Sequence, residues 1–131
     1  MPRLAKTLRL LVLTAGLLSA CSGGGGSASG AVEAYLEAIV SGDSTRAVNV
    51  SCAAAEAQAQ TEAASFASVE ASLEGLACQE IGVQGEATLV TCSGKFVAVY
   101  NGENTEISLE GRTFQVVQEA GEWRVCGYAQ Q

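Results

Sequence analysis

The chain has 131 residues, of which 14 are acidic, 7 are basic and none is histidine, so its net charge at neutral pH is −7. Nucleic acid and anionic lipid repel an acidic chain, and we therefore expect no nucleic-acid partner. Without histidine, the commonest general base and metal ligand is missing, and a serine triad of the usual kind cannot be assembled.

The first twenty residues have the order of an exported precursor. Three basic residues stand before or at the start of an apolar run over residues 10–18, which is too short to cross a bilayer as a helix. We interpret residues 1–20 as a signal peptide rather than a membrane-spanning anchor. The run leads into Leu18-Ser19-Ala20-Cys21, which resembles the bacterial lipobox: an aliphatic residue and two small residues before a cysteine.

This resemblance implies that Cys21 receives a diacylglycerol through a thioether and that the signal peptide is cut in front of it. It also implies acylation of the new amino group, typically with palmitate. Two or three acyl chains hold a protein stably at a membrane. We therefore expect a bacterial lipoprotein on the extracytoplasmic face of the cell membrane, inner or outer where the envelope has two. The alternative is an ordinary signal peptide whose first mature residue is Cys21.

Residues 21–30 follow the cut with glycine, serine and alanine and predict a flexible tether. Residues 31–131 are enough for one domain with a modest core. Removal of the signal peptide leaves four basic residues against all fourteen acidic ones, a net charge of −10. The carboxylates are spread singly along the chain, which favours a role in solubility over a cation site.

Three helices are predicted at the start of the domain. In residues 31–42 the apolar side chains recur with the spacing of one helical face, and Gly42 ends the pattern. Asp43 is a suitable N-cap for a short second helix that ends near residues 51–52. Residues 53–66 are rich in alanine, glutamate and glutamine without glycine or proline, which predicts a third helix.

The remainder of the domain has the pattern of an antiparallel sheet. Apolar and polar residues alternate from residue 69 onward, and turn signals separate four runs, at residues 69–83, 87–100, 105–119 and 122–128. The alternation is interrupted at residues 111–113, which predicts a bulge or bend that curves the sheet. The expected fold is α+β, with three N-terminal helices packed on a curved four-stranded antiparallel meander.

Four cysteines remain beside Cys21, an even number in an exported chain, and this predicts disulfides. Pairing the first two strands around residue 85 places Cys78 opposite Cys92, within disulfide reach. The second and fourth strands of a meander are not neighbours, which leaves Cys52 to pair with Cys126. Since there is no Cys-x-x-Cys and no zinc-ribbon spacing, we expect no metal and no cofactor.

Two segments resemble the nuclear transport factor 2-like superfamily, also called SnoaL-like or cystatin-like, and especially its small bacterial lipoproteins. One is the opening helix of residues 31–43, which ends in Gly42-Asp43 before a short second helix. The other is the closing strand Gly121-Glu122-Trp123-Arg124-Val125. The resemblance covers residues 31–128 and implies a cone-shaped fold. Some family members are isomerases or dehydratases that work inside the cone with Asp, His or Tyr.

The pattern of the family's enzymes is not met here, so we expect a non-catalytic domain. It would bind a small apolar ligand in the cone or an envelope protein on the exposed sheet face. The expected pocket is lined by Tyr35, Phe66, Phe96 and Phe114, although Tyr35 and Trp123 also stand at positions typical of core packing. The alternative is a small isomerase or hydrolase-type enzyme, with Tyr35 as an oxyanion donor and a glutamate as base.

Overall fold

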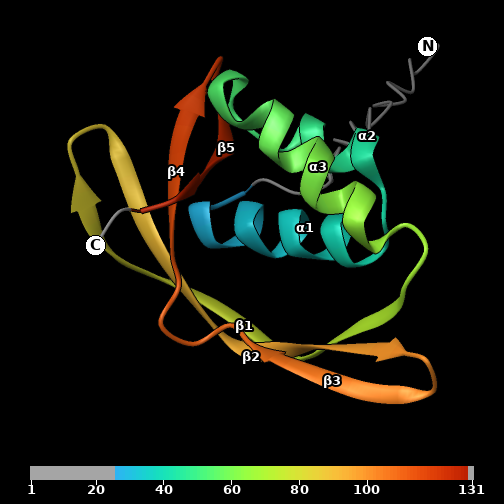
Figure 1. Ribbon diagram of the computed structural model, residues 1–131. Coiled ribbons are helices and arrows are strands. Elements are labelled where there is room, and N and C mark those ends of the chain that lie inside the picture. The colour runs from blue at the N-terminus through green and yellow to red at the C-terminus, as the bar shows by residue number, and fades with distance from the viewer. Residues whose placement is uncertain (1–25, 130–131) are drawn as a thin grey trace, which may run out of the picture.

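The structure is a computed structural model that describes residues 26–129 (Figure 1). Three helices precede a five-stranded antiparallel sheet, so the α+β expectation is confirmed. The predicted signal peptide, the predicted lipidation site Cys21 and the first half of the predicted tether, residues 21–25, lie outside the described residues. Within residues 26–129, no helix is long and apolar enough to cross a membrane.

Helix α1 (Ala28–Val40) begins three residues before the predicted domain boundary. The reason is a local cap, because the Ser27 hydroxyl accepts a hydrogen bond from the Gly30 backbone at 3.0 Å. Ala28 and Ala31 are fully buried, so the first turn packs as part of the core and not as tether. The helix ends where expected, with Gly42 in the left-handed region at φ +70°.

The next two helices, α2 and α3, pack against α1. Helix α2 (Ser44–Asn49) has the predicted cap, with the Asp43 carboxylate accepting from the Arg46 backbone at 3.0 Å. A turn of 3-10 helix (Ala53–Ala55) then leads into helix α3 (Glu56–Phe66), in agreement with the predicted third helix. The buried positions of α3 are alanines, and these small side chains permit close approach to the rest of the core.

The sheet is built on one long hairpin. Its strands are β1 (Glu70–Gln84) and β2 (Ala87–Tyr100), and they pair along their full length. The other edge of β2 pairs first with β3 (Glu103–Ser108) and then with β4 (Thr113–Glu119), and β5 (Glu122–Tyr128) closes the sheet beside β4. Strand β1 lies at the outer edge, where the Glu33 carboxylate of α1 accepts from the Cys78 backbone at 3.3 Å.

Where the sequence predicts one third strand, the structure has two. Strands β3 and β4 run along the same edge of β2, but the four residues 109–112 stand opposite only the three residues 92–94 of β2. This extra residue is the predicted bulge, and it breaks the ladder into separate strands. The meander therefore has five strands, with the order β1-β2-β4-β5 and β3 also on β2.

The same point on β2 is irregular on its other side. Strand β1 has a register shift between Glu74 and Ala77, so two of its residues stand opposite Gly94 alone. Gly94 has φ +106°, and a Cβ there would lie 2.7 Å from the Glu74 carbonyl oxygen. Since both neighbours of β2 bulge beside Gly94, the sheet bends at this residue.

The curved sheet surrounds α1 on one side, and α2 and α3 cover it on the other (Figure 1). Eight residues of α1 are buried, among them Val32, Tyr35 and Leu36. They pack against the inner faces of the strands, where Val90, Phe114 and Val116 are fully buried. Helix α1 is thus the centre of the core, and Trp123 packs half-buried against its margin.

Both predicted disulfides are present. Cys78 and Cys92 are register partners in the β1–β2 hairpin with their Cα atoms 4.0 Å apart, and Cys52 is bonded to Cys126 of β5. Beside the second bridge, Ser51 pairs in parallel with Val125, so the loop after α2 covers the outer edge of β5. Two disulfides indicate that the chain folds in an oxidising compartment.

Candidate functional site

An open pocket of about 260 Å³ lies between α1, α3 and the curved part of the sheet. We call it the inner pocket. It is slightly smaller than the sites that take drug-sized ligands, so it suits a small molecule. Its lining comes from α1, α3, β2, β3, β5 and the β3–β4 loop, and consists of Leu36, Ile39, Glu62, Ser65, Phe66, Phe96, Ile107, Arg112 and Tyr128.

The inner wall of the pocket is apolar. Phe66, at the end of α3, packs against Phe96 of β2 with ring centroids 5.5 Å apart. Leu36 and Ile39 come from successive turns of α1, and Ile107 comes from β3, which follows the curve of the sheet. The pocket is therefore a gap between two layers that each present apolar side chains, as expected of a preformed ligand site.

A carboxylate lies at one side of this wall. The Tyr35 hydroxyl donates to Glu62 Oε2 at 2.8 Å, and Gln58 Nε2 donates to Glu62 Oε1 at 2.7 Å. Burial raises the pKa of Tyr35 well above its usual range, and the hydrogen bond and negative charge of Glu62 raise it further. Tyr35 is thus a fixed donor to Glu62, and both carboxylate oxygens already have a partner.

Arg112 and Tyr128 also line the pocket. Burial raises the pKa of the Tyr128 hydroxyl, and the Glu62 charge adds to the rise, while the charge of Arg112 and its hydrogen bond to Tyr128 oppose it. Arg112 is the last residue of the β3–β4 bulge, so the bulge places it here. A second hollow of about 370 Å³, the outer hollow, shares Arg112 and Tyr128 and extends over Gly111, Thr113 and Ala129.

Arg112 differs from the other basic residues that the structure describes. Arg46 pairs with Glu37, Lys95 with Glu74 and Glu106, and Arg124 with Glu122. Within residues 26–129, Arg112 alone among the basic residues has no carboxylate oxygen within ion-pair distance. In a domain with so large an excess of acidic groups, this leaves one guanidinium directed to the two hollows.

The lining differs from the set expected from the sequence. Phe66 and Phe96 contribute, but Phe114 is fully buried, with its ring centroid 5.0 Å from that of Tyr128 and 6.4 Å from that of Tyr35. Tyr35 is 3% exposed and packs in the core, and its hydroxyl alone reaches toward the pocket, through Glu62. These two rings support the pocket wall from behind.

Sequence reasoning missed Glu62, Arg112 and Tyr128. The sequence does contain an indication of Arg112, because this residue lies within residues 111–113, where the strand alternation fails, and bulges often direct a side chain into a site. It contains no indication of Glu62, because the hydrogen bond between Tyr35 and Glu62 joins residues 27 positions apart, in two helices whose packing cannot be read from the sequence.

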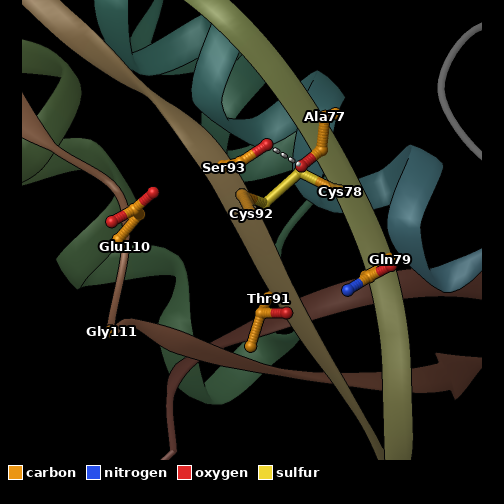
Figure 2. Close-up of a pocket in the computed structure, with 8 residues that line it drawn as sticks. All are labelled: Ala77, Cys78, Gln79, Thr91, Cys92, Ser93, Glu110 and Gly111. Carbon is orange, nitrogen blue, oxygen red and sulfur yellow. Dashed lines mark hydrogen bonds between the residues drawn. A yellow bond between two sulfur atoms is a disulfide. The ribbon is translucent and has the colours of Figure 1, made fainter.

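A larger hollow of about 410 Å³ lies where β1, β2 and the β3–β4 loop meet, around the Cys78–Cys92 disulfide (Figure 2). Figure 2 shows Ser93 directed to the Ala77 carbonyl oxygen, which it meets at 3.4 Å, with Glu110 across the hollow. Its two sulfurs are joined in a bridge, so neither is a free thiol. We therefore regard it as a surface depression beside a structural disulfide.

One group of three potential metal ligands occurs in residues 26–129, namely Cys52, Glu119 and Cys126. The two sulfurs are bonded to each other, so neither is the thiolate that binds a metal. This group is the Cys52–Cys126 disulfide with a glutamate beside it.

The fold and the site define an α+β domain of three helices followed by a curved antiparallel sheet, with an apolar pocket between the two layers. Comparison of the chain with protein-family models, characterised proteins and solved structures gives no match.

Proposed function

We propose that this protein is a lipid-anchored extracytoplasmic domain of the nuclear transport factor 2-like type, and that it binds a small, mainly apolar molecule in the inner pocket. The observation that carries the proposal is the convergence of apolar side chains from α1, α3, β2 and β3 on an open space with few polar groups. A preformed, mainly apolar pocket with a few polar groups at its sides is the usual form of a small-molecule site.

The place of action rests on the N-terminus and the cysteines. The lipobox resemblance at Cys21 supports attachment to the membrane through lipid, and the two disulfides support an oxidising compartment. Three helices before a curved antiparallel sheet, with a pocket between them, support the nuclear transport factor 2-like assignment.

Phenylbutanol, a neutral molecule with one aromatic ring, tests the pocket. Urea unfolding of the full chain is followed by the fluorescence of its single tryptophan, Trp123. A ligand that binds only the native state raises the unfolding midpoint, and we expect millimolar phenylbutanol to do so, since about a dozen heavy atoms give on the order of millimolar affinity.

Ile107→Asp, which places a charge on the pocket wall, should abolish this rise. The matched control is Ile81→Asp, the same substitution at a side chain that is 52% exposed on β1, and it should preserve the rise. Cooperative unfolding of both variants without phenylbutanol establishes that they fold. No stabilisation of the natural chain, or an equal effect in Ile107→Asp, would overturn the proposal.

Two alternative functions are each supported by one observation. The first is binding of an envelope protein. Ile81 and Val83 are 52% and 73% exposed on β1, which favours such a partner, and crosslinking in intact cells followed by mass spectrometry tests it.

The second alternative is an isomerase-type enzyme. Glu62 lines the pocket and accepts a hydrogen bond from Tyr35, which favours Glu62 as a catalytic base. We prefer binding because both Glu62 oxygens are engaged and the Tyr35 proton is already donated.

A further inference from the structure

The inner pocket has one polar group whose bonding capacity is largely unused. A guanidinium carries five N–H donors, and Arg112 makes a hydrogen bond to Tyr128 while no carboxylate of residues 26–129 lies within ion-pair distance. Glu62, the other charged group of the pocket, differs in this respect, because Tyr35 and Gln58 each donate to one of its oxygens.

The pocket therefore offers free hydrogen-bond donors rather than free acceptors, and it suits a ligand that carries a hydrogen-bond acceptor. Arg112 is half-buried, and guanidinium groups in such positions pair with carboxylates through two parallel hydrogen bonds. Arg112 also lines the outer hollow, so an anionic group can meet it there while an attached apolar body lies along Phe66, Phe96 and Ile107.

We infer that the ligand of this domain is a small amphiphile with one carboxylate-like anionic group, which pairs with Arg112 at the junction of the inner pocket and the outer hollow. The inference rests on the proposed function, since it names the class of molecule that the same pocket takes. The protonated Tyr128 hydroxyl, beside Arg112, is a second donor for the anionic group.

The test compares phenylbutyrate with phenylbutanol, which share the ring and chain and differ only in the head group. With the full chain, we expect phenylbutyrate to bind about tenfold more tightly, as for a charge-assisted hydrogen-bonded pair. Affinities come from the rise in urea midpoint with ligand concentration. Added salt should reduce the preference for phenylbutyrate and leave phenylbutanol binding unchanged.

Arg112→Gln should abolish the preference for phenylbutyrate over phenylbutanol, and Arg112→Lys should retain part of it because the charge remains but the planar fork is lost. The matched control is Arg46→Gln, which removes the same charge from an exposed pair with Glu37, and it should retain the full preference.

Equal binding of the two probes to the natural chain, or a preference that survives in Arg112→Gln, would overturn this inference while leaving the apolar pocket in place. Failure of both probes to bind would instead overturn the proposed function, and the inference with it.

Discussion

At the scale of single residues, Tyr35 has two roles. Its ring packs in the core against Phe114, and its hydroxyl holds the Glu62 carboxylate of α3 at 2.8 Å. Tyrosine ionises near pH 10 in an unfolded chain, whereas in the native state the pKa of Tyr35 is raised by burial and by Glu62. Above about pH 10, the native state therefore keeps the Tyr35 proton that the unfolded state loses.

The sign of the resulting pH dependence follows from this difference. The stabilisation is fully present below about pH 10 and is lost as the pH rises from there toward the raised pKa of Tyr35. We expect Tyr35→Phe to lower the free energy of unfolding by about 1 kcal/mol near neutral pH, through loss of the hydrogen bond. Above about pH 10 its stability should fall less steeply than that of the natural chain.

Urea unfolding at a series of pH values measures both effects. Tyr128 and Lys95, whose pKa values are also raised, contribute to the slope that remains in Tyr35→Phe. Parallel curves for the natural chain and the variant above about pH 10 would show that Tyr35 loses its proton as readily in the native state as in the unfolded one.

At the scale of the elements, Gly94 determines the shape of the sheet. We expect Gly94→Ala to cost at least about 2 kcal/mol, because the residue has φ +106° and its Cβ would lie within 2.8 Å of the Gly75 backbone. The matched control is Gly102→Ala in the β2–β3 turn, where φ is +80° but no atom lies within 4 Å. This control should cost about 1 kcal/mol, the backbone strain alone. Equal losses would mean that the close approach at Gly94 is relieved at no cost.

The two disulfides join elements at very different separations along the chain, 74 residues for Cys52–Cys126 and 14 for Cys78–Cys92. By loop entropy, the double variant Cys52→Ser/Cys126→Ser should lose about 4.5 kcal/mol and Cys78→Ser/Cys92→Ser about 3 kcal/mol. Urea unfolding without reductant measures the two losses. A greater loss for the shorter loop would show that native contacts of the hairpin bridge, not chain entropy, dominate its contribution.

At the scale of the whole molecule, the proposed lipid attachment and the folding of the domain depend on separate parts of the chain. We expect Cys21→Ser to leave the folded domain intact but to prevent lipid attachment, so that the protein is released or mislocalised. Membrane fractionation together with incorporation of labelled palmitate measures this, and Ser22→Ala is the matched control that should remain attached. Finding Cys21→Ser still processed and membrane-bound would contradict lipidation at that residue.

Much of the architecture was predictable because it depends on local pattern. The Asp43 cap, the turn at residue 85 and the alternation of the strands are properties of a few neighbouring residues. The hairpin register placed Cys78 opposite Cys92, and elimination then paired Cys52 with Cys126. The start of α1 was predicted late, because Ser27 and Ala28 have the composition of a tether and are helical through a cap and burial.

The sequence by itself determined the order of helices and strands, the disulfide pairs and the point at which the predicted third strand bulges, since each follows from spacing along the chain. Only the tertiary structure decided the pocket. It buried Phe114 and the ring of Tyr35, and it brought Glu62, Arg112 and Tyr128 around Phe66 and Phe96. These residues meet because bulges on both sides of Gly94 curve the sheet around α1. The angle of that curve is set by packing between distant segments, which the spacing of residues along the chain does not record.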